Sequence, residues 1–234
     1  LAGGACQASD GMYFGGLPDG IILFRPKRKN HWRPVVLPHA HEAVWQIACA
    51  GNEAWAVTSA PSYAYRLRGG VVNEAIKVPG VGLRSVLIDG DRQWFGGLRD
   101  HRVWRRAEGS LRVAAATRFA EVLSLHKSNA GVVALSIDSA QGKPGRFPAP
   151  NGDGGGALER LDEQGIHALW TTSGELPLSA AVESDGEAYV GTDRGLIYRI
   201  DGRRILRIAV PGRRPVEAIV RSGQQVTVWG GGMR

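Results

Sequence analysis

The chain has 234 residues, of which 43% are hydrophobic and 33 are glycine. Enough apolar residues are present to form a core, and the glycines follow no three-residue period, so disordered and collagen-like chains are excluded. The net charge of +7 is spread along the chain, and no apolar run is long enough to span a membrane. We therefore expect a soluble chain with no specific nucleic-acid site, while binding to a polyanion stays open.

The first elements in chain order are an inner strand at Ala2–Ala8 and a hairpin at Ser9–Arg25, SDGMYFGGLPDGIILFR. Asp-Gly dipeptides mark tight turns, and the short apolar runs between turns mark strands. The second repeat predicts four short strands, with the innermost strand first. These strands are Ala43–Ala50, Glu53–Thr58, Tyr63–Arg68 and Val71–Val78.

The third repeat follows the same order as the second. Its strands are Leu83–Ile88, Arg92–Gly97, His101–Arg106 and Leu111–Ala116. The fourth repeat is weaker, because its GVVALS strand at Gly131–Ser136 is followed by a Gly/Pro-rich insertion at residues 137–156. A surface loop and a functional lid are both consistent with this insertion.

The fifth repeat is the clearest copy, with the sequence SDGEAYVGTDRGLIYRIDG at Ser184–Gly202. A sixth repeat stops after its second strand, at Val226–Trp229. The four predicted strands of the fifth repeat are Leu178–Glu183, Glu187–Thr192, Leu196–Ile200 and Arg204–Val210.

Aromatic residues begin the second strand of most repeats, and successive repeats lie about 40 residues apart. These residues are Tyr13, Trp55, Trp94 and Tyr189, and we expect them to be buried between neighbouring sheets. Four short strands per repeat are typical of propeller blades. We therefore predict an all-β fold, a single β-propeller domain with six blades, of which the last is incomplete. The expected blades cover residues 1–37, 43–78, 83–117, 121–171, 178–210 and 215–234.

The fifth repeat resembles the two-component-regulator propeller repeat of bacterial sensor proteins. The positions that carry the resemblance are Asp185-Gly186, Tyr189, Gly191-Thr192, Gly195 and Tyr198–Asp201. Other repeats carry the pattern in diluted form. The resemblance implies a propeller related to sensor domains and lactonases, and it specifies fold better than function.

Cys6 and Cys49 occupy nearly equivalent places in neighbouring repeats. We expect them to be buried free thiols, because a disulfide requires a closer approach of two backbones than adjacent blades normally give.

Propeller ligands commonly bind on the face formed by loops that precede the inner strands and loops that join the second and third strands. Histidines near carboxylates on that face are candidates for metal binding or proton transfer. The catalytic candidates are His39, His41, Glu42, Asp100 and His101. The candidates for binding a ligand or partner are Arg84, Arg99, Arg118, Asp193, Arg194, Arg213 and Arg214, with Asp19 and Glu175 on the same face.

The favoured function is a non-catalytic binding or scaffold module that contacts a protein or carbohydrate, because no catalytic motif accompanies the repeat. We expect no cofactor, a bacterial source, and a periplasmic or extracellular location. The alternative is a lactonase-, lyase- or hydrolase-like enzyme with its site at the channel mouth, where a divalent metal would bind.

The incomplete last blade predicts a partner. Its final strand, formed by Val226, Thr227, Val228 and Trp229, would expose an unpaired backbone edge. Exposed edges recruit other strands. We therefore expect the missing strands of this blade to come from elsewhere: a second chain cut from the same precursor, a different subunit, or residues of the natural protein outside this sequence.

Overall fold

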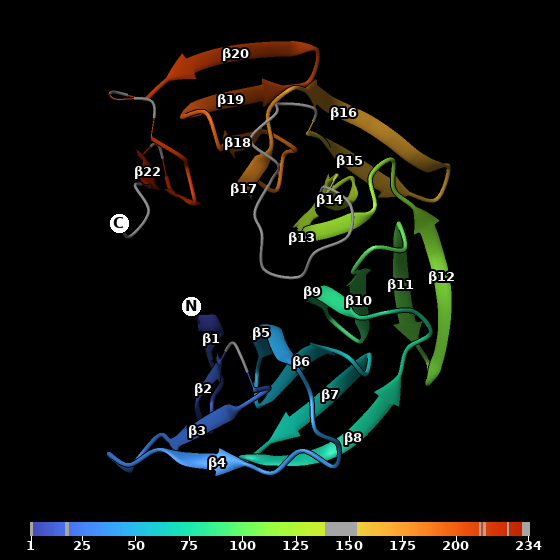
Figure 1. Ribbon diagram of the computed structural model, residues 1–234, viewed down its shortest axis with the longest axis vertical. Helices are drawn as coiled ribbons and strands as arrows, with labels where there is room; N and C mark the ends of the chain where they lie inside the picture. The colour runs from blue at the N-terminus through green and yellow to red at the C-terminus, as the bar shows by residue number, and fades with distance from the viewer. Residues whose placement is uncertain are drawn as a thin grey trace. The chain divides into compact units, whose positions relative to one another are not determined.

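A computed structural model describes residues 2–16, 19–138, 154–210, 212, 214–223 and 225–230, and all of its named elements are β-strands (Figure 1). Contacts divide the chain into two compact units, Leu1–Ala114 and Ala115–Arg234, called the N-terminal half and the C-terminal half below. Most of the predicted insertion, residues 139–153, lies outside the described residues, as does Arg213.

The N-terminal half contains three antiparallel four-stranded sheets, except that β12 ends two residues beyond it. The first sheet has β1 (Ala2–Gln7), β2 (Gly11–Gly16), β3 (Ile22–Pro26) and β4 (Arg33–Val35). The second has β5 (Ala43–Ala50), β6 (Glu53–Ser59), β7 (Tyr63–Arg68) and β8 (Val71–Lys77). The third has β9 (Leu83–Asp89), β10 (Arg92–Gly97), β11 (Arg102–Ala107) and β12 (Ser110–Ala116).

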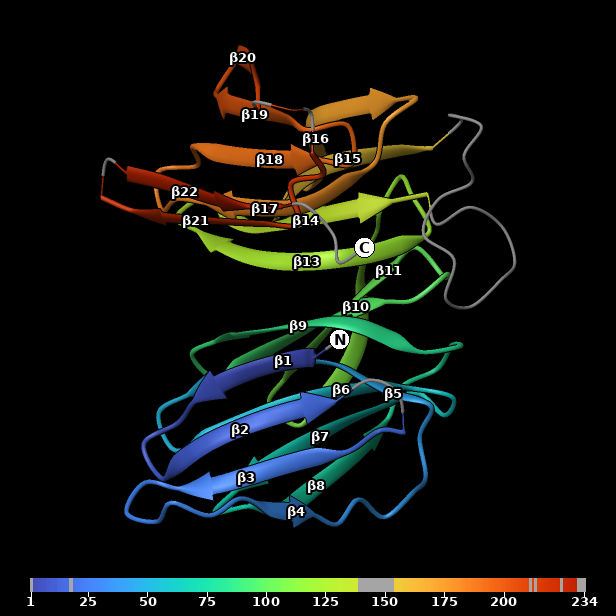
Figure 2. The same ribbon diagram turned by 60° about the vertical axis from the view of Figure 1, so that its left-hand side comes forward.

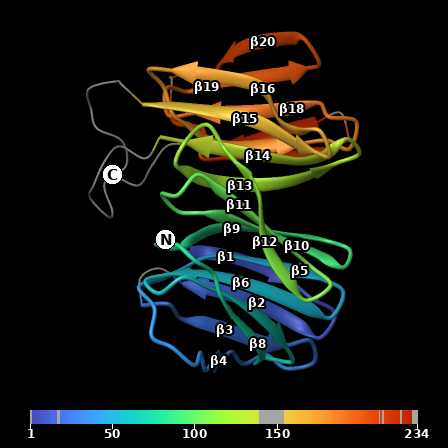
Figure 3. The ribbon, with the colours of Figure 1, turned by 90° about the vertical axis from the view of Figure 1, so that its right-hand side faces the viewer.

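The C-terminal half contains two four-stranded sheets and one two-stranded sheet. The first has β13 (Glu121–Ser128), β14 (Gly131–Ile137), β15 (Gly155–Asp162) and β16 (Gly165–Ser173), and Figure 3 shows β13, β14 and β15 side by side in that order. The second has β17 (Pro177–Val182), β18 (Ala188–Thr192), β19 (Leu196–Asp201) and β20 (Arg204–Ala209). The last has only β21 (Ala218–Ser222) and β22 (Gln225–Trp229).

Within each sheet, each strand pairs with the next one along the chain, as the repeat predicted. One boundary differs for a physical reason. The prediction began the third strand of the third repeat at His101, but His101 has a φ of 61° and β11 begins at Arg102. A left-handed residue cannot continue a strand, so His101 belongs to the preceding loop.

The aromatic residues of the second strands are buried, and Tyr13, Trp55 and Tyr189 pack in clusters with residues of the next sheet. Tyr13 and Trp55 are at most 1% exposed, while Tyr189 is 9% exposed. Tyr189 packs on Val216 and Ile219 of the following repeat. Close packing also explains the glycine that follows the aromatic, because a Cβ at Gly191 would lie 2.4 Å from Val216 Cγ1.

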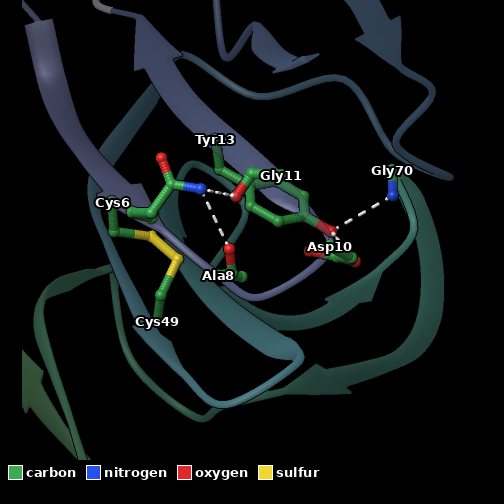
Figure 4. Close-up of a disulfide and its surroundings, with 8 residues drawn as sticks. Cys6, Ala8, Asp10, Gly11, Tyr13, Cys49 and Gly70 are labelled. Carbon is green, nitrogen blue, oxygen red and sulfur yellow. Dashed lines mark hydrogen bonds between the residues drawn. A yellow bond between two sulfur atoms is a disulfide. The ribbon is translucent and has the colours of Figure 1, made fainter. Parts of the chain in front are cut away.

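The expectation of free thiols is wrong. Cys6 of β1 and Cys49 of β5 form a disulfide, and their Cα atoms are 5.6 Å apart (Figure 4). Adjacent inner strands therefore approach more closely than we expected, within the usual range for a disulfide. Gly4 of β1 lies close to β5, since a Cβ there would be 3.1 Å from the backbone nitrogen of Ile47, and the β1–β5 contact joins two sheets of the N-terminal half.

Every inner strand of the four-stranded sheets carries a β-bulge near its start. The register of each pair with the second strand skips one residue there. Bulges bend a strand and re-aim a side chain, and they are common beside functional sites. The skipped residues are Gly3, Trp45, Arg84, Leu123 and Leu178.

Candidate functional site

Two of the predicted catalytic histidines lie in an aromatic cluster on the loop that precedes β5. The exposed ring of His39 lies 4.5 Å from the ring of Tyr63, and the ring of His41 lies 5.3 Å from that of Tyr65. The two histidine rings are 6.4 Å apart and perpendicular, so they do not converge on one point.

His41 is held in a fixed orientation rather than offered to a ligand. Its side chain is buried, with Nδ1 3.1 Å from the carbonyl oxygen of Pro61 and Nε2 2.6 Å from the hydroxyl of Tyr65. Burial lowers the pKa of His41, and the hydrogen bond to Pro61 only partly offsets it. A neutral imidazole can donate one bond and accept the other, so both ring nitrogens are occupied. Glu42, the next residue, is exposed.

The bulges of β5 and β9 bring a tryptophan and an arginine together. The guanidinium carbon of Arg84 lies 4.4 Å from the centre of the Trp45 ring, and both side chains are partly exposed. Trp45 Nε1 donates a hydrogen bond of 2.8 Å to Ser59 Oγ, which fixes the indole. The pair thus forms a rigid, half-exposed cation–π stack.

The loop between β10 and β11 holds three predicted residues in a strained backbone. Arg99 and His101 have φ values of 69° and 61°, and both are exposed. Residues with side chains adopt such values at a cost, and they cluster at ligand clamps and active sites. Asp100 between them accepts a hydrogen bond of 3.1 Å from the backbone N–H of Arg102 through Oδ1.

The carboxyl group of Asp100 is packed inward. Its Oδ2 atom is buried without a hydrogen-bond partner, and a Cβ at Gly80 would lie 2.7 Å from it. Burial raises the pKa of Asp100, although the Arg102 N–H opposes the rise. The carboxyl group of Asp100 therefore packs against Gly80 of the loop before β9.

In the C-terminal half the predicted residues mostly tie loops together. The backbone N–H of Arg118 donates to both oxygens of Glu159 at 3.1 Å, while the Arg118 side chain is exposed. Asp193 Oδ1 accepts a hydrogen bond of 2.9 Å from the N–H of Leu176. Arg194 and Arg214 are exposed.

Two further predicted residues, Glu175 and Asp19, also take part in hydrogen bonds. Glu175 is buried and accepts hydrogen bonds from the hydroxyls of Tyr198 and Thr172. Burial and the Glu175 carboxylate raise the pKa of Tyr198 to about 12. Asp19, on the β2–β3 loop, has a φ of 78°, and its N–H donates to the carbonyl of Glu42.

The metal-site alternative finds no geometric support within the described ranges. No group of three or more His, Cys, Asp or Glu side chains there is placed to hold an ion. His41, Asp100 and Glu175 are instead bound to neighbouring groups of the protein.

Trp45 and Tyr63, two residues of the candidate binding surface, were not predicted as site residues from the sequence. Trp45 and Tyr63 were assigned only to strands, yet the first stacks on Arg84 and the second stacks on His39. A signal was present at Trp45, because a tryptophan is large for an inner strand and three of the other repeats have Gly3, Leu123 or Leu178 at the equivalent position. We name the exposed or half-exposed residues Trp45, Arg84, His39, Tyr63 and His101 the aromatic–cationic face of the N-terminal half.

The C-terminal half holds a half-buried histidine on an inner strand. His126 is on the inner strand β13, and its Nε2 lies 2.8 Å from Ser124 Oγ. Burial lowers the pKa of His126 to about 4. His126 is therefore neutral at ordinary pH.

No protein-family model matches the chain, and no curated protein sequence matches it. Solved structures do match. The WD40 β-propeller domain of Doa1 superposes with a TM-score of 0.69 at 11% identity, over 97% of this chain and 74% of that one. The computationally designed Ika8 protein gives 0.71 at 14% identity, over 98% of this chain and 68% of that one.

The extracellular domain of a one-component system from B. thetaiotaomicron is also similar. Its TM-score is 0.67 at 14% identity, over 98% of this chain but only 31% of that chain. At such identities the likeness concerns the fold alone. The all-β, β-propeller prediction is therefore confirmed, and the six sheets agree with about six blades. No helix long and apolar enough to cross a membrane occurs among the described residues.

Proposed function

We propose that the protein is a non-catalytic binding propeller that holds a protein partner through the aromatic–cationic face of its N-terminal half. The observation that carries this proposal is the stack of Arg84 on Trp45, which two β-bulges place side by side and Ser59 holds in place. Tryptophan, tyrosine and arginine are the residues that most often dominate protein interfaces.

The chemistry of the face favours an acidic partner group. A guanidinium carries its N–H donors in a planar fork that matches the geometry of a carboxylate. His39 and His101 add exposed imidazole side chains, on the loop before β5 and the loop between β10 and β11. A carbohydrate that bears a carboxylate offers the same group, so an acidic sugar is the alternative that the experiment must separate from a protein.

The disulfide supports a location outside the cytoplasm. Disulfides persist in oxidising compartments such as the periplasm and the cell exterior. The Cys6–Cys49 bond therefore favours an exported protein, in line with the resemblance of the repeat to that of bacterial sensor propellers. We also propose that the protein works inside a larger complex.

The test is site-specific photo-crosslinking in periplasmic extract. A photoreactive residue at His101 should trap one protein species, and Arg84→Ala should abolish that adduct because the acidic group loses its partner. The matched control is the same residue at Asp91, an exposed turn position between β9 and β10. Equal trapping from both positions would show that the face is not the contact surface.

The carbohydrate alternative has its own measurement. Titration calorimetry with a trigalacturonate probe should give no saturable heat. If it gives micromolar binding that Trp45→Ala and Arg84→Ala remove, the partner is an acidic sugar and the proposed protein partner is wrong.

A further inference from the structure

The loop between β10 and β11 holds a carboxyl group in a space that two glycines leave open. A Cβ at Gly97 would lie 1.8 Å from Asp100 Oδ1, and a Cβ at Gly80 would lie 2.7 Å from Asp100 Oδ2. Both distances are shorter than real contacts of a Cβ atom. Glycine at these two positions therefore allows the Asp100 carboxyl group to pack inward instead of extending into solvent.

The two glycines lie in different segments of the third sheet. Gly97 ends β10, and Gly80 lies in the loop before β9, the neighbouring strand of the same sheet (Figure 2). The same loop before β9 accepts a hydrogen bond of 2.9 Å from the N–H of Leu98, through the carbonyl of Gly82. Two contacts therefore attach the loop between β10 and β11 to the loop before β9: the Leu98–Gly82 hydrogen bond and the packing of Asp100 on Gly80.

The loop before β9 is also linked to the stack that carries the proposed function. Gly82 forms a β-bridge with Ser59, and a Cβ at Gly82 would lie 2.5 Å from Ser59 Cβ. Ser59 Oγ in turn accepts the hydrogen bond from Trp45 Nε1, and the Trp45 ring stacks on Arg84. A continuous run of contacts thus connects Asp100 with the aromatic–cationic face.

The residues on either side of Asp100 need an anchor of this kind. Arg99 and His101 both have positive φ values, of 69° and 61°. Such conformations persist only where the surrounding structure holds them. Asp100 supplies part of that hold, because its Oδ1 accepts a hydrogen bond of 3.1 Å from the N–H of Arg102. The exposed side chains of Arg99 and His101 therefore depend on the placement of the carboxyl group between them.

The inward position is unfavourable for an ionised carboxyl group. Oδ2 of Asp100 is buried and has no hydrogen-bond partner. The neighbouring charged groups are those of Arg99, His101 and Arg102, while the end of β10 and residues 78–82 contribute no ionisable side chain. A buried carboxylate oxygen without a partner costs more free energy than a carboxylic acid in the same place.

Proton binding and loop packing are therefore coupled. Burial raises the pKa of Asp100, and the Arg102 N–H and the charges of Arg102 and His101 only partly offset the rise. A group whose pKa is higher in the packed loop than in water binds its proton preferentially in the packed loop. Proton uptake thus stabilises the packed loop as the pH falls, and loss of the proton favours a loop in which the carboxylate turns to water.

We propose that Asp100 is an acid-sensitive latch, which holds Arg99 and His101 in place when its carboxyl group carries a proton and releases them when it is ionised. The inference rests on the proposed binding function and adds the regulation of the same site. The aromatic–cationic face should bind its acidic partner group more tightly at mildly acidic pH than at neutral pH.

The latch is tested without any partner, by hydrogen exchange of single amides in NMR spectra. The N–H groups of Leu98 and Arg102 are the donors that the packed loop protects. After correction for intrinsic exchange rates, their protection should be at least about threefold higher at pH 5.5 than at pH 7.5. The N–H of Phe95, within β10, is the internal control and should be equally protected at both pH values.

Asp100→Asn is the matched variant, because asparagine has the same shape, keeps an oxygen acceptor for the Arg102 N–H and does not titrate. Protection of Leu98 and Arg102 should then be independent of pH, and as high as in the unmodified protein at pH 5.5. Equal protection of the unmodified protein at both pH values overturns the inference. So does a pH dependence that persists in Asp100→Asn.

The effect on binding is measured with the photo-crosslinking assay, in which the photoreactive residue replaces His101. His39→Gln is added, because exposed imidazoles in general change charge between pH 5 and pH 8. The yield of the adduct should be at least about threefold higher at pH 5.5 than at pH 7.5, since the loop is then packed. Asp100→Asn should remove this difference.

The two measurements separate this inference from the proposed function. If no adduct forms at either pH, the proposed function is wrong, and hydrogen exchange alone decides whether Asp100 is a latch. If the adduct forms equally at both pH values, the regulation is wrong although the binding function stands. If the yield changes with pH while the protection of Leu98 and Arg102 does not, Asp100 acts only through its charge, and the latch is wrong.

Discussion

The sheets β5–β8 and β17–β20 are built from the same repeat and the same strand order, yet they are stabilised differently. In the first, the outer strand β8 buries Val72 and Ile76 partly against neighbours, and the inner strand β5 is joined to β1 by a disulfide. In the second, β20 is bare, and among the described residues no disulfide is present in that half. The repeat therefore specifies the sheet, whereas its stability depends on the neighbours.

The largest expected effect on stability comes from removing the disulfide, which only the N-terminal half contains. Cys6 and Cys49 are 43 residues apart, and a cross-link over a loop of that length stabilises by about 4 kcal/mol in the chain-entropy account. The double variant Cys6→Ala/Cys49→Ala should therefore lose about that much in free energy of unfolding. Hydrogen exchange should show faster exchange in β1 and β5.

The control for this experiment is the C-terminal half. Peptides from β13 to β19 should keep their exchange rates in the same sample, and reduction of the unmodified protein should reproduce the variant. If exchange accelerates equally in both halves, the disulfide does not act locally on the N-terminal half.

The next largest effect is a pH dependence of the free energy of unfolding that comes from His126 in the C-terminal half. Burial lowers the pKa of His126 from 6.5 to about 4, so the unfolded chain takes up the proton first as the pH falls. The stabilising contribution is complete above about pH 6.5 and is lost progressively toward pH 4, with a total of roughly 3 kcal/mol. Urea unfolding at pH 7.5 and pH 4.5 measures this loss.

His126→Gln is the matched variant, because glutamine keeps a polar group near Ser124 Oγ but does not titrate in this range. The loss of stability between the two pH values should be smaller in the variant by roughly the same amount. An identical pH dependence in both proteins would falsify the assignment of the titration to His126.

Strand positions were readily predicted from the sequence because they follow local rules. Asp-Gly turns, apolar runs and the repeated aromatic placed β5 at the bounds that the structure shows, Ala43–Ala50. The disulfide was not predicted, because it depends on how closely two inner strands approach across sheets. The distance between Cys6 and Cys49 is a tertiary quantity that no local pattern encodes.

The candidate site was predictable only as a set of loops. His39, Arg84 and His101 were predicted to lie on loops or at strand ends, but their surroundings depend on bulges and left-handed residues. A bulge shifts the register by one residue and changes the direction of a side chain. The alternation of buried and exposed residues therefore does not predict which side chains lie at the candidate binding surface. Trp45 is the clearest example, because the skipped position, not the strand assignment, brings it to Arg84.

The smallest expected effect on stability concerns two equivalent ion pairs, one in each half of the chain. Glu187 and Glu53 each precede the repeat aromatic by two residues, and each pairs with an arginine of the third strand, Arg199 or Arg66. Glu187 also binds Arg221 of the last repeat, and its side chain is 9% exposed against 26% for Glu53. The C-terminal half thus uses this carboxylate to join two sheets.

We expect Glu187→Gln to lower the free energy of unfolding by about 1–2 kcal/mol, because it weakens charge-assisted hydrogen bonds to two arginines at once. Glu53→Gln should cost less than about 1 kcal/mol, as is usual for a partly exposed pair with a single partner. Urea unfolding of both variants at pH 7 provides the measurement. Hydrogen exchange of β21 should accelerate only in Glu187→Gln, since Arg221 lies on that strand and its contact with Glu187 holds the two-stranded sheet to its neighbour. Equal effects of the two substitutions, with no change in β21, would mean that packing around Val216 and Ile219 alone anchors the last sheet.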